Sequence, residues 1–299
     1  MRRPFTGCGT ALVTPFRRDG SLDEAAVSRL AKRQIDAGIH FLVPCGTTGE
    51  SPTLTEDERI RVVELVVEQA RGRVPVLAGA GGYNTKEVIH AAEQMGRAGA
   101  DGILSVTPYY NKPTPDGLVA HYRAIAEATN LPIIVYNVPG RTGCNVDAGT
   151  LMRLASIPNI AGVKEASGNM SQMCDVCAAV PDTFIVLSGD DALTLPLMAV
   201  GGRGIVSVAS NEIPAEMSRM VELAEKGDVA AARQLHNRLM PLMQVNFIES
   251  NPIPVKCAMA ALGLLEEHYR LPMVPPRDAS RERITAVLKS LALPLAIPA

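Results

Sequence analysis

Eight short runs of β-forming residues, separated by segments with helical periodicity, constrain the fold of this chain more than any other feature. Parallel strands that alternate with helices are joined by right-handed crossovers, and eight such units in roughly 210 residues are typical of one barrel fold. We therefore predict an α/β fold, a (β/α)8 TIM barrel with a C-terminal helical extension. The expected strands are Thr10–Thr14, Phe41–Pro44, Val74–Ala78, Gly102–Val106, Ile133–Tyr136, Ile160–Lys164, Phe184–Leu187 and Gly204–Val208.

An open, doubly wound sheet is the alternative arrangement of alternating strands and helices. Such a sheet would bind a dinucleotide through a GxGxxG loop that is followed by an acidic residue. The glycine clusters at Leu77–Gly82 (LAGAGG) and Gly201–Gly204 (GGRG) have neither that spacing nor the acidic partner. The barrel is therefore the preferred interpretation.

The segment Glu56–Ala70 shows the clearest helical periodicity. Thr55 before it and Glu58 three residues later form the sequence pattern of a capping box at a helix N-terminus. Apolar residues recur at helical spacing, and one face is expected to bury Ile60, Val63, Val67 and Ala70.

The strand signals stop after Ser210, and helical patterns take over. In the segment ESNPIPVK, Pro252 and Pro254 stand where a helix can begin but cannot continue. We expect a catalytic barrel domain over residues 1–211 and a helical region over residues 212–299 packed on the barrel. The expected helices of that region are Pro214–Glu225, Val229–Phe247, Pro254–Leu264 and Arg281–Leu291.

Composition and charge exclude several classes of function. Apolar residues make up 47% of the chain and charged residues 20%, which allows a sizeable core. The formal net charge is −2 and no basic block occurs, so neither nucleic acid nor a membrane surface is expected as a partner. No apolar run is long enough for a membrane span or a signal sequence, and we expect a soluble cytoplasmic protein.

The cysteines and histidines do not have the spacing of metal ligands. Cys174 and Cys177 have CxxC spacing, but they lie inside a helical pattern without a second pair or nearby histidines. We therefore expect structural cysteines on one helix. No metal is expected.

Lys164 is the most informative single residue. In IAGVKEASG it stands where an apolar strand gives way to a polar loop, at the end of a barrel strand where reactive groups are found. Burial against apolar neighbours would lower the pKa of this lysine and leave an amine that can attack a carbonyl. The alternative is a lysine that extends its charged end into solvent.

Other polar residues follow neighbouring predicted strands. Thr47 and Thr48 lie between glycines and offer hydroxyl and N–H groups to a carboxylate, or form a tight turn. Tyr136 places a phenol at a strand end, and Arg141 lies on a stiff loop from which it could hold a carboxylate bidentately. A phosphate-binding barrel is disfavoured because the acidic pair in SGDDA (188–192) would repel phosphate.

Six motifs, in this order, resemble those of the dihydrodipicolinate synthase / N-acetylneuraminate lyase family over essentially the whole chain: GTTGES, TPYYNKPT, YNVPGRTG, GVKEASG, LSGDDA and NPIPVK. The resemblance implies a (β/α)8 barrel with a C-terminal helical region, assembled as a homotetramer (a dimer of dimers). It implies a class I aldolase that forms a lysine–pyruvate Schiff base without a metal or an organic cofactor. It also implies condensation of pyruvate with L-aspartate 4-semialdehyde to 4-hydroxy-tetrahydrodipicolinate, in lysine and diaminopimelate biosynthesis.

The resemblance also implies roles for individual residues. Lys164 would be the Schiff-base nucleophile, and Tyr136 would move protons to and from the intermediates. Thr47 would link Tyr136 in a proton relay to Tyr110, which would reach in from the neighbouring subunit. The residues implied to bind substrate are Thr48 and Arg141, which would hold the two carboxylates, and Gly189 and Val206, whose backbone carbonyls would line the pocket.

Two alternatives to this reaction remain at this point. One is a related pyruvate aldolase of the same family that acts on N-acetylneuraminate or a 2-keto-3-deoxy sugar acid. Arg141 argues against it, because the aldehydes of those enzymes lack the carboxylate that this arginine would hold. The other is a non-catalytic barrel that serves as a regulator.

Overall fold

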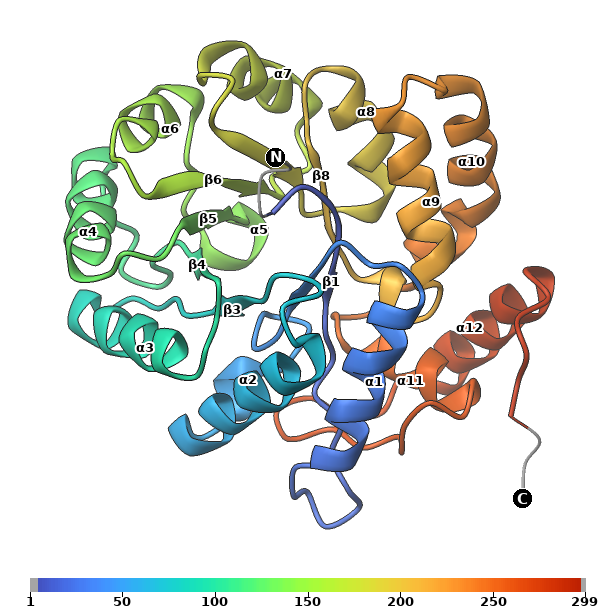
Figure 1. Ribbon diagram of the computed structural model, residues 1–299. Helices are drawn as coiled ribbons and strands as arrows, with labels where there is room; N and C mark the ends of the chain where they lie inside the picture. Colours follow the sequence, from blue (N-terminus) through green and yellow to red (C-terminus); the bar gives the residue numbers. More distant parts are fainter. Residues whose placement is uncertain (1–4, 297–299) are drawn as a thin grey trace.

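A computed structural model describes residues 5–296 and confirms the predicted barrel. Its eight strands are all parallel, in the order β2-β1-β8-β7-β6-β5-β4-β3, and surround the centre of the molecule in Figure 1. A parallel bridge between Leu42 and Val76 joins β2 to β3 and closes the sheet. The strands are β1 (Gly7–Ala11), β2 (Phe41–Val43), β3 (Leu77–Gly79), β4 (Gly102–Val106), β5 (Ile133–Asn137), β6 (Ile160–Glu165), β7 (Ile185–Ser188) and β8 (Gly204–Ser207).

Helices surround the strands and cover the outer face of the barrel (Figure 1). They are α1 (Glu24–Asp36), α2 (Glu56–Ala70), α3 (Thr85–Arg97), α4 (Pro115–Ala128), the short α5 (Pro139–Thr142), α6 (Ala148–Ala155), α7 (Met170–Ala179), α8 (Thr194–Ala199), α9 (Pro214–Glu225), α10 (Val229–Val245), α11 (Ile253–Ala261) and α12 (Asp278–Ser290). Three short 3₁₀ segments complete the assignment: η1 (Ser51–Thr53), η2 (Asp191–Leu193) and η3 (Ala209–Asn211).

The alternation of side chains along each strand divides the apolar core into two layers. The inner layer fills the barrel and includes Phe41, Leu104, Ile134 and Leu187. The outer layer lies between strands and helices and is much larger. Inward-facing polar side chains near the strand ends therefore adjoin the inner layer, and outward-facing ones adjoin the outer layer.

The position of β1 differs from the prediction. We expected a strand at Thr10–Thr14, whereas β1 is Gly7–Ala11. A Cβ atom at Gly9 would lie 2.1 Å from the ring of Phe41, so the ring packs directly on the glycine backbone. This packing explains why a glycine-containing segment forms the strand and the more apolar segment after it does not.

Helix α2 has the predicted bounds and the predicted capping box, in which the Thr55 side chain and the Glu58 side chain each bond the other's backbone. Its buried face is rotated from the predicted one. Val62 and Val66 are buried, whereas Ile60 and Val67 are only partly buried. Two apolar stripes adjoin on this helix, and the sequence pattern alone does not select between them.

The C-terminal helices begin where predicted for α9 and α10 and within three residues of the prediction for α11 and α12. Helix α9 lies between α8 and α1 in the ring around the barrel, and α10 packs on its outer side (Figure 1). The division between residues 211 and 212 remains an interpretation, because α9 contacts both the strands and the later helices.

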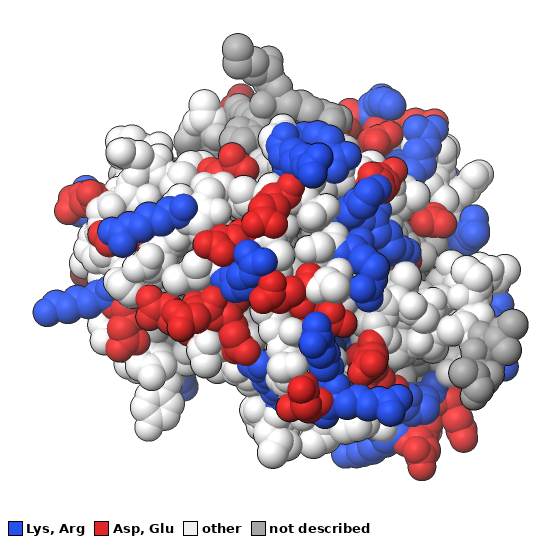
Figure 2. Space-filling view, turned by 60° about the horizontal axis from the view of Figure 1, so that its bottom comes forward, with Lys and Arg blue, Asp and Glu red and all other residues white. Residues whose placement is uncertain are grey.

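The visible surface in Figure 2 carries acidic and basic side chains side by side rather than in separate regions. This distribution agrees with the small net charge. Within residues 5–296, no helix is both long enough and apolar enough to cross a membrane.

Candidate active site

Lys164 and Tyr136 form the centre of the candidate site. They are paired residues of the neighbouring strands β6 and β5, so their side chains enter the barrel side by side. The Nζ atom of Lys164 lies 4.1 Å from the centroid of the Tyr136 ring. Both side chains are buried, with Lys164 only 5% exposed, which excludes the alternative of a lysine extended into solvent.

A cavity of about 120 Å³ opens beside this pair at the carboxyl ends of the strands. Gly189 contributes to its wall at the end of β7, and a Cβ atom there would lie 3.0 Å from Cε of Lys164. The missing side chain therefore leaves room for the lysine. The residues that line the cavity are Thr47, Thr48, Tyr136, Val138, Arg141, Lys164, Ala166, Gly189, Asp190, Val208, Phe247 and Asn251.

The loop GTTGES folds into consecutive turns at the mouth of the barrel. The backbone N–H groups of Gly49 and Glu50 donate to the carbonyls of Gly46 and Thr47. These turns place Thr47 and Thr48 on the cavity wall. The amide Nδ2 of Asn251 donates a hydrogen bond of 2.9 Å to Oγ1 of Thr48, so a residue from the C-terminal region holds the loop.

Arg141 lies on the short helix α5. Pro139 occupies its first turn, and Gly143 ends it in the left-handed conformation. The Nη2 atom of Arg141 donates to the backbone carbonyl of Asn251 at 3.2 Å, while much of the side chain stays exposed. The arginine can therefore turn its remaining N–H groups toward an anion in the cavity.

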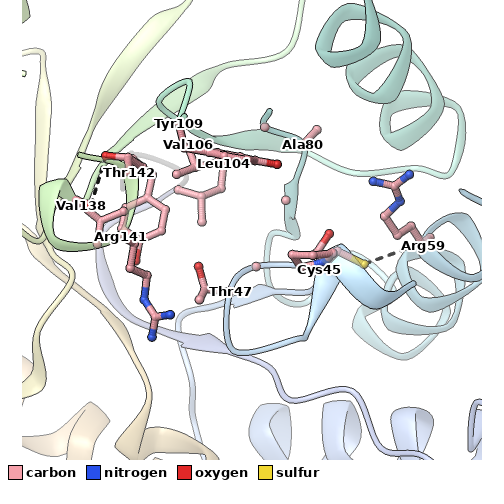
Figure 3. Close-up of a pocket in the computed structure, with 16 residues that line it drawn as sticks. Cys45, Thr47, Arg59, Ala80, Leu104, Val106, Tyr109, Val138, Arg141 and Thr142 are labelled. Carbon is pink, nitrogen blue, oxygen red and sulfur yellow. Dashed lines mark hydrogen bonds between the residues drawn. The ribbon is translucent and has the colours of Figure 1, made fainter. Parts of the chain in front are cut away.

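A second cavity of about 260 Å³ adjoins the first. Thr47, Tyr136, Val138 and Arg141 line both. Figure 3 shows Thr47 between the side chains of Arg141 and Cys45 on one side of this second cavity. Tyr136 therefore lies where the two cavities adjoin, beside Lys164.

Two of the predicted site residues lie elsewhere in the described chain. Tyr110, on the loop after β4, is 92% exposed and lines neither cavity. Val206 is fully buried in the inner layer of the barrel, beneath the cavity walls. Their predicted roles stay predictions.

The acidic pair of SGDDA divides between two environments. Asp190 lines the cavity beside Lys164. Asp191 is buried, and accepts hydrogen bonds from the hydroxyl of Ser207 and the backbone N–H groups of Val208 and Ala209. Burial raises the pKa of Asp191 to about 6, against the effect of these hydrogen bonds. Asp191 therefore fixes the end of β8, and only Asp190 faces the site.

The sequence analysis missed contributions from the C-terminal region. Phe247 and Asn251 line the cavity. Lys256 is fully buried and donates to Oε1 of Glu50 at 2.6 Å, which anchors the end of the GTTGES loop. The motif ESNPIPVK carries the only sequence signal for these contacts, and it predicts a helix boundary and contributes to the family resemblance without indicating a role in the site.

No group of three or more His, Cys, Asp or Glu residues within the described range is arranged to hold a metal ion. Cys174 and Cys177 lie in α7, as the helical pattern predicted, and neither is in a disulfide. None of the site features above depends on them.

The fold and the site together define a class of protein, the (β/α)8-barrel enzymes with a buried amine at the barrel mouth. Within this class, a model of the dihydrodipicolinate synthetase family matches residues 4–291, and the chain belongs to that family.

Named relatives agree over nearly the full length. The 4-hydroxy-tetrahydrodipicolinate synthase of Koribacter versatilis is 56% identical over 282 residues, covering 94% of each chain. That of Chlorobium chlorochromatii is 50% identical over 295 residues, covering 98% of this chain and 100% of the relative. The crystal structure of dihydrodipicolinate synthase from Aquifex aeolicus superposes with a TM-score of 0.96 at 43% identity, covering 98% of this chain and 100% of that one.

Proposed function

We propose that this chain is a lyase that condenses pyruvate with L-aspartate 4-semialdehyde to 4-hydroxy-tetrahydrodipicolinate, in lysine and diaminopimelate biosynthesis. The observation that carries the proposal is the buried Lys164 amine beside the Tyr136 phenol in a cavity at the barrel mouth. The similarity to two 4-hydroxy-tetrahydrodipicolinate synthases supports this reaction over a sugar-acid aldolase or a non-catalytic regulator.

In the first step, the neutral amine of Lys164 attacks the ketone carbon of pyruvate. The carbinolamine loses water when the Tyr136 hydroxyl supplies a proton to the departing hydroxyl group. The resulting imine loses a proton from its methyl group and becomes an enamine. No organic cofactor or metal is needed for these steps, because the protonated imine itself accepts electrons.

In the second step, the enamine carbon attacks the aldehyde of L-aspartate 4-semialdehyde, and the aldehyde oxygen takes up a proton. The amino group of this substrate then attacks the imine carbon, and Lys164 leaves as an amine. Thr48 holds the pyruvate carboxylate through its backbone N–H, and Arg141 holds the carboxylate of the aldehyde. Backbone carbonyls of Gly189 and Val206 complete the pocket.

Protons reach Tyr136 through Thr47 and Tyr110 of the partner subunit. The 92% exposure of Tyr110 supports this part of the proposal, since a phenol directed away from its own chain is free to enter another. As the family resemblance implies, the active form in this proposal is a homotetramer, a dimer of dimers, and we infer that it acts in the cytoplasm.

Borohydride reduction tests the covalent step. Intact-mass measurement after incubation with pyruvate and borohydride should show a pyruvate-sized adduct on wild type and none on Lys164→Ala. The matched control is Lys226→Ala, at an exposed lysine of the C-terminal region, which should be trapped like wild type. No adduct on wild type would refute the Schiff-base mechanism.

A further inference from the structure

A second pair of residues lies directly behind the catalytic pair. Asn137 follows Tyr136 on β5, Glu165 follows Lys164 on β6, and the two are partners in the strand register. Because side chains alternate along a strand, Asn137 and Glu165 point out of the barrel, toward the surrounding helices. Both are fully buried. Each residue of the catalytic pair is thus followed by a buried polar side chain.

The carboxylate of Glu165 is surrounded by neutral hydrogen-bond donors. Its Oε2 accepts from Nδ2 of Asn137 at 2.9 Å and from Nε2 of Gln172 at 3.3 Å. Its Oε1 accepts from the backbone N–H of Ser167 at 2.7 Å. Among the ion pairs of residues 5–296, none includes Glu165. A carboxylate buried without a cation is unfavourable, so stability alone does not account for an acid here.

Both oxygens of the Glu165 side chain accept hydrogen bonds, and these bonds fix the orientation of its neighbours. With Nδ2 directed at Glu165, the Oδ1 atom of Asn137 accepts the backbone N–H of Val146 at 3.0 Å. Val146 lies in the segment between α6 and the short helix α5, which carries Arg141. Asn137 therefore joins that segment to the ends of β5 and β6.

Backbone hydrogen bonds of the same two residues extend the connection. The carbonyl of Asn137 accepts the N–H of Ala166 at 2.9 Å, and the carbonyl of Glu165 accepts the N–H of Gly189 at 2.8 Å. Both donors line the cavity beside Lys164. The pair therefore connects the ends of β5, β6 and β7, which form the part of the wall nearest the lysine.

We propose that Asn137 and Glu165 are positioning residues that hold the Lys164 amine and the Tyr136 phenol in reacting geometry. This inference rests on the proposed function. It adds that the Asn137–Glu165 pair is what places the Lys164 amine beside the Tyr136 phenol. A displacement of about 1 Å between reacting groups lowers rates about 100-fold. Loss of the pair should therefore slow imine formation while pyruvate still binds.

Glu165→Gln is the sharpest variant. It replaces one accepting oxygen with an NH₂ group, which cannot accept the hydrogen bonds that the surrounding donors now make to Glu165. We expect the rate of imine formation with pyruvate to fall by about 10- to 100-fold. Borohydride trapping at timed intervals measures this rate. The KM for pyruvate should change much less than kcat. Asn137→Leu should show the same pattern, and the double variant should be no slower than the worse single variant, because the two residues act as one unit.

Asn159→Leu provides the matched control. Asn159 precedes β6 at its opposite end, where its Nδ2 atom donates to the carbonyls of Ala126 at 2.9 Å and Thr129 at 2.8 Å. This variant should lose stability, yet its folded fraction should form the imine at the wild-type rate. Equal slowing in Asn159→Leu and Asn137→Leu would overturn the proposal, because it would show a general effect on the barrel.

The same experiment separates two kinds of failure. Without trapping of wild type, the proposed function fails. If wild type is trapped and Glu165→Gln is trapped at the same rate, the proposed function stands and the positioning role is overturned. Should Glu165→Gln not fold, Gln172→Ala removes only the outermost donor, and a few-fold slower imine formation is then expected. A wild-type rate in Gln172→Ala would overturn the proposal.

Discussion

Among the described residues two lysines are buried, and their surroundings differ in one respect that decides their roles. Lys256 lies beneath the C-terminal helical region, where it donates to Glu50 at 2.6 Å and to the carbonyl of Thr14 at 3.1 Å. Burial lowers the pKa of Lys256, and the charge of Glu50 opposes that shift. Lys164 lies at the barrel mouth against an aromatic ring, next to a cavity.

Both lysines therefore have an aromatic neighbour, since the Nζ atom of Lys256 lies 4.5 Å from the centroid of the Phe16 ring. Of these two buried lysines, only Lys256 has a carboxylate partner within ion-pair distance among residues 5–296. The comparison teaches that burial alone does not make a lysine reactive. A buried lysine that is paired with a carboxylate stabilises the fold, and one that faces an open cavity is available for chemistry.

The largest effect is expected from Lys164→Met. Without the amine no Schiff base forms, and kcat should fall by roughly 10⁴- to 10⁶-fold, as when other enzymes lose their nucleophile. The free energy of unfolding should stay level or rise, because an apolar side chain replaces an unpaired amine. Steady-state kinetics and denaturant unfolding check the two parts. Substantial residual turnover would show that another group performs the reaction.

The same substitution at the other lysine should give the opposite pattern. Lys256→Met leaves the Glu50 carboxylate buried without its partner, and the free energy of unfolding should fall by about 3–5 kcal/mol. The folded fraction should still be trapped by pyruvate and borohydride. In the double variant Glu50→Gln/Lys256→Met the stability should partly recover. Equal instability of the single and the double variant would mean that the ion pair is not the cause.

A smaller effect is expected at Arg141, which separates aldehyde binding from the chemistry of Lys164. In Arg141→Leu the KM for L-aspartate 4-semialdehyde should rise about 10- to 100-fold, the usual effect of losing a hydrogen bond to a charged group. The pyruvate adduct should form at the wild-type rate. Arg153→Leu, at an exposed ion pair with Asp116, serves as the control. A parallel loss of adduct formation in Arg141→Leu would contradict this division of roles.

The smallest effect concerns acid stability near Lys256. Arg270 stacks on the ring of Phe16, which Lys256 also contacts, and its guanidinium lies 4.2 Å from the ring centroid. Hydrogen bonds from Arg270 are the main cause that lowers the pKa of Glu58 to about 2 from its usual 4.5. Because the folded-state pKa is the lower one, this stabilisation is present above pH 4.5 and is lost as the pH falls toward 2.

Arg270→Gln should therefore show a smaller drop in Tm than wild type between pH 4.5 and pH 2, although its Tm near neutral pH is lower. Thermal unfolding followed by circular dichroism at several pH values measures the difference. Parallel pH dependence in the two proteins would show that Glu58 is not held by Arg270 in solution.

Local patterns in the sequence predicted most of the fold. Short runs of β-forming residues predicted both ends of β4 correctly, and they predicted the ends of β5 and β6 to within one residue. The error at β1 arose because a contact distant in the sequence, the Phe41 ring on Gly9, outweighs the apolar character of the following residues. The rotated face of α2 has a similar cause, since packing against neighbours selects one of two apolar stripes.

The candidate site was predictable to the extent that its residues follow consecutive strands. Lys164, Tyr136, Thr47 and Gly189 come together because parallel strands end at the same side of a barrel. Asn251 and Lys256 belong to no strand end, and their contacts with Thr48 and Glu50 follow from the docking of the C-terminal region. No local pattern encodes that docking.

This dependence on the C-terminal region has a consequence for synthesis of the protein. Glu50 and its partner Lys256 are 206 residues apart. At the usual rate of about 5–20 residues per second, the ribosome adds the lysine roughly 10–40 s after the glutamate. Until then Glu50 has no Lys256 to pair with. Thr48, two residues before Glu50, also lacks its hydrogen bond from Asn251. A nascent chain can thus complete all eight strands and still lack an ordered pocket, so that catalysis is expected to begin only after Lys256 has been added.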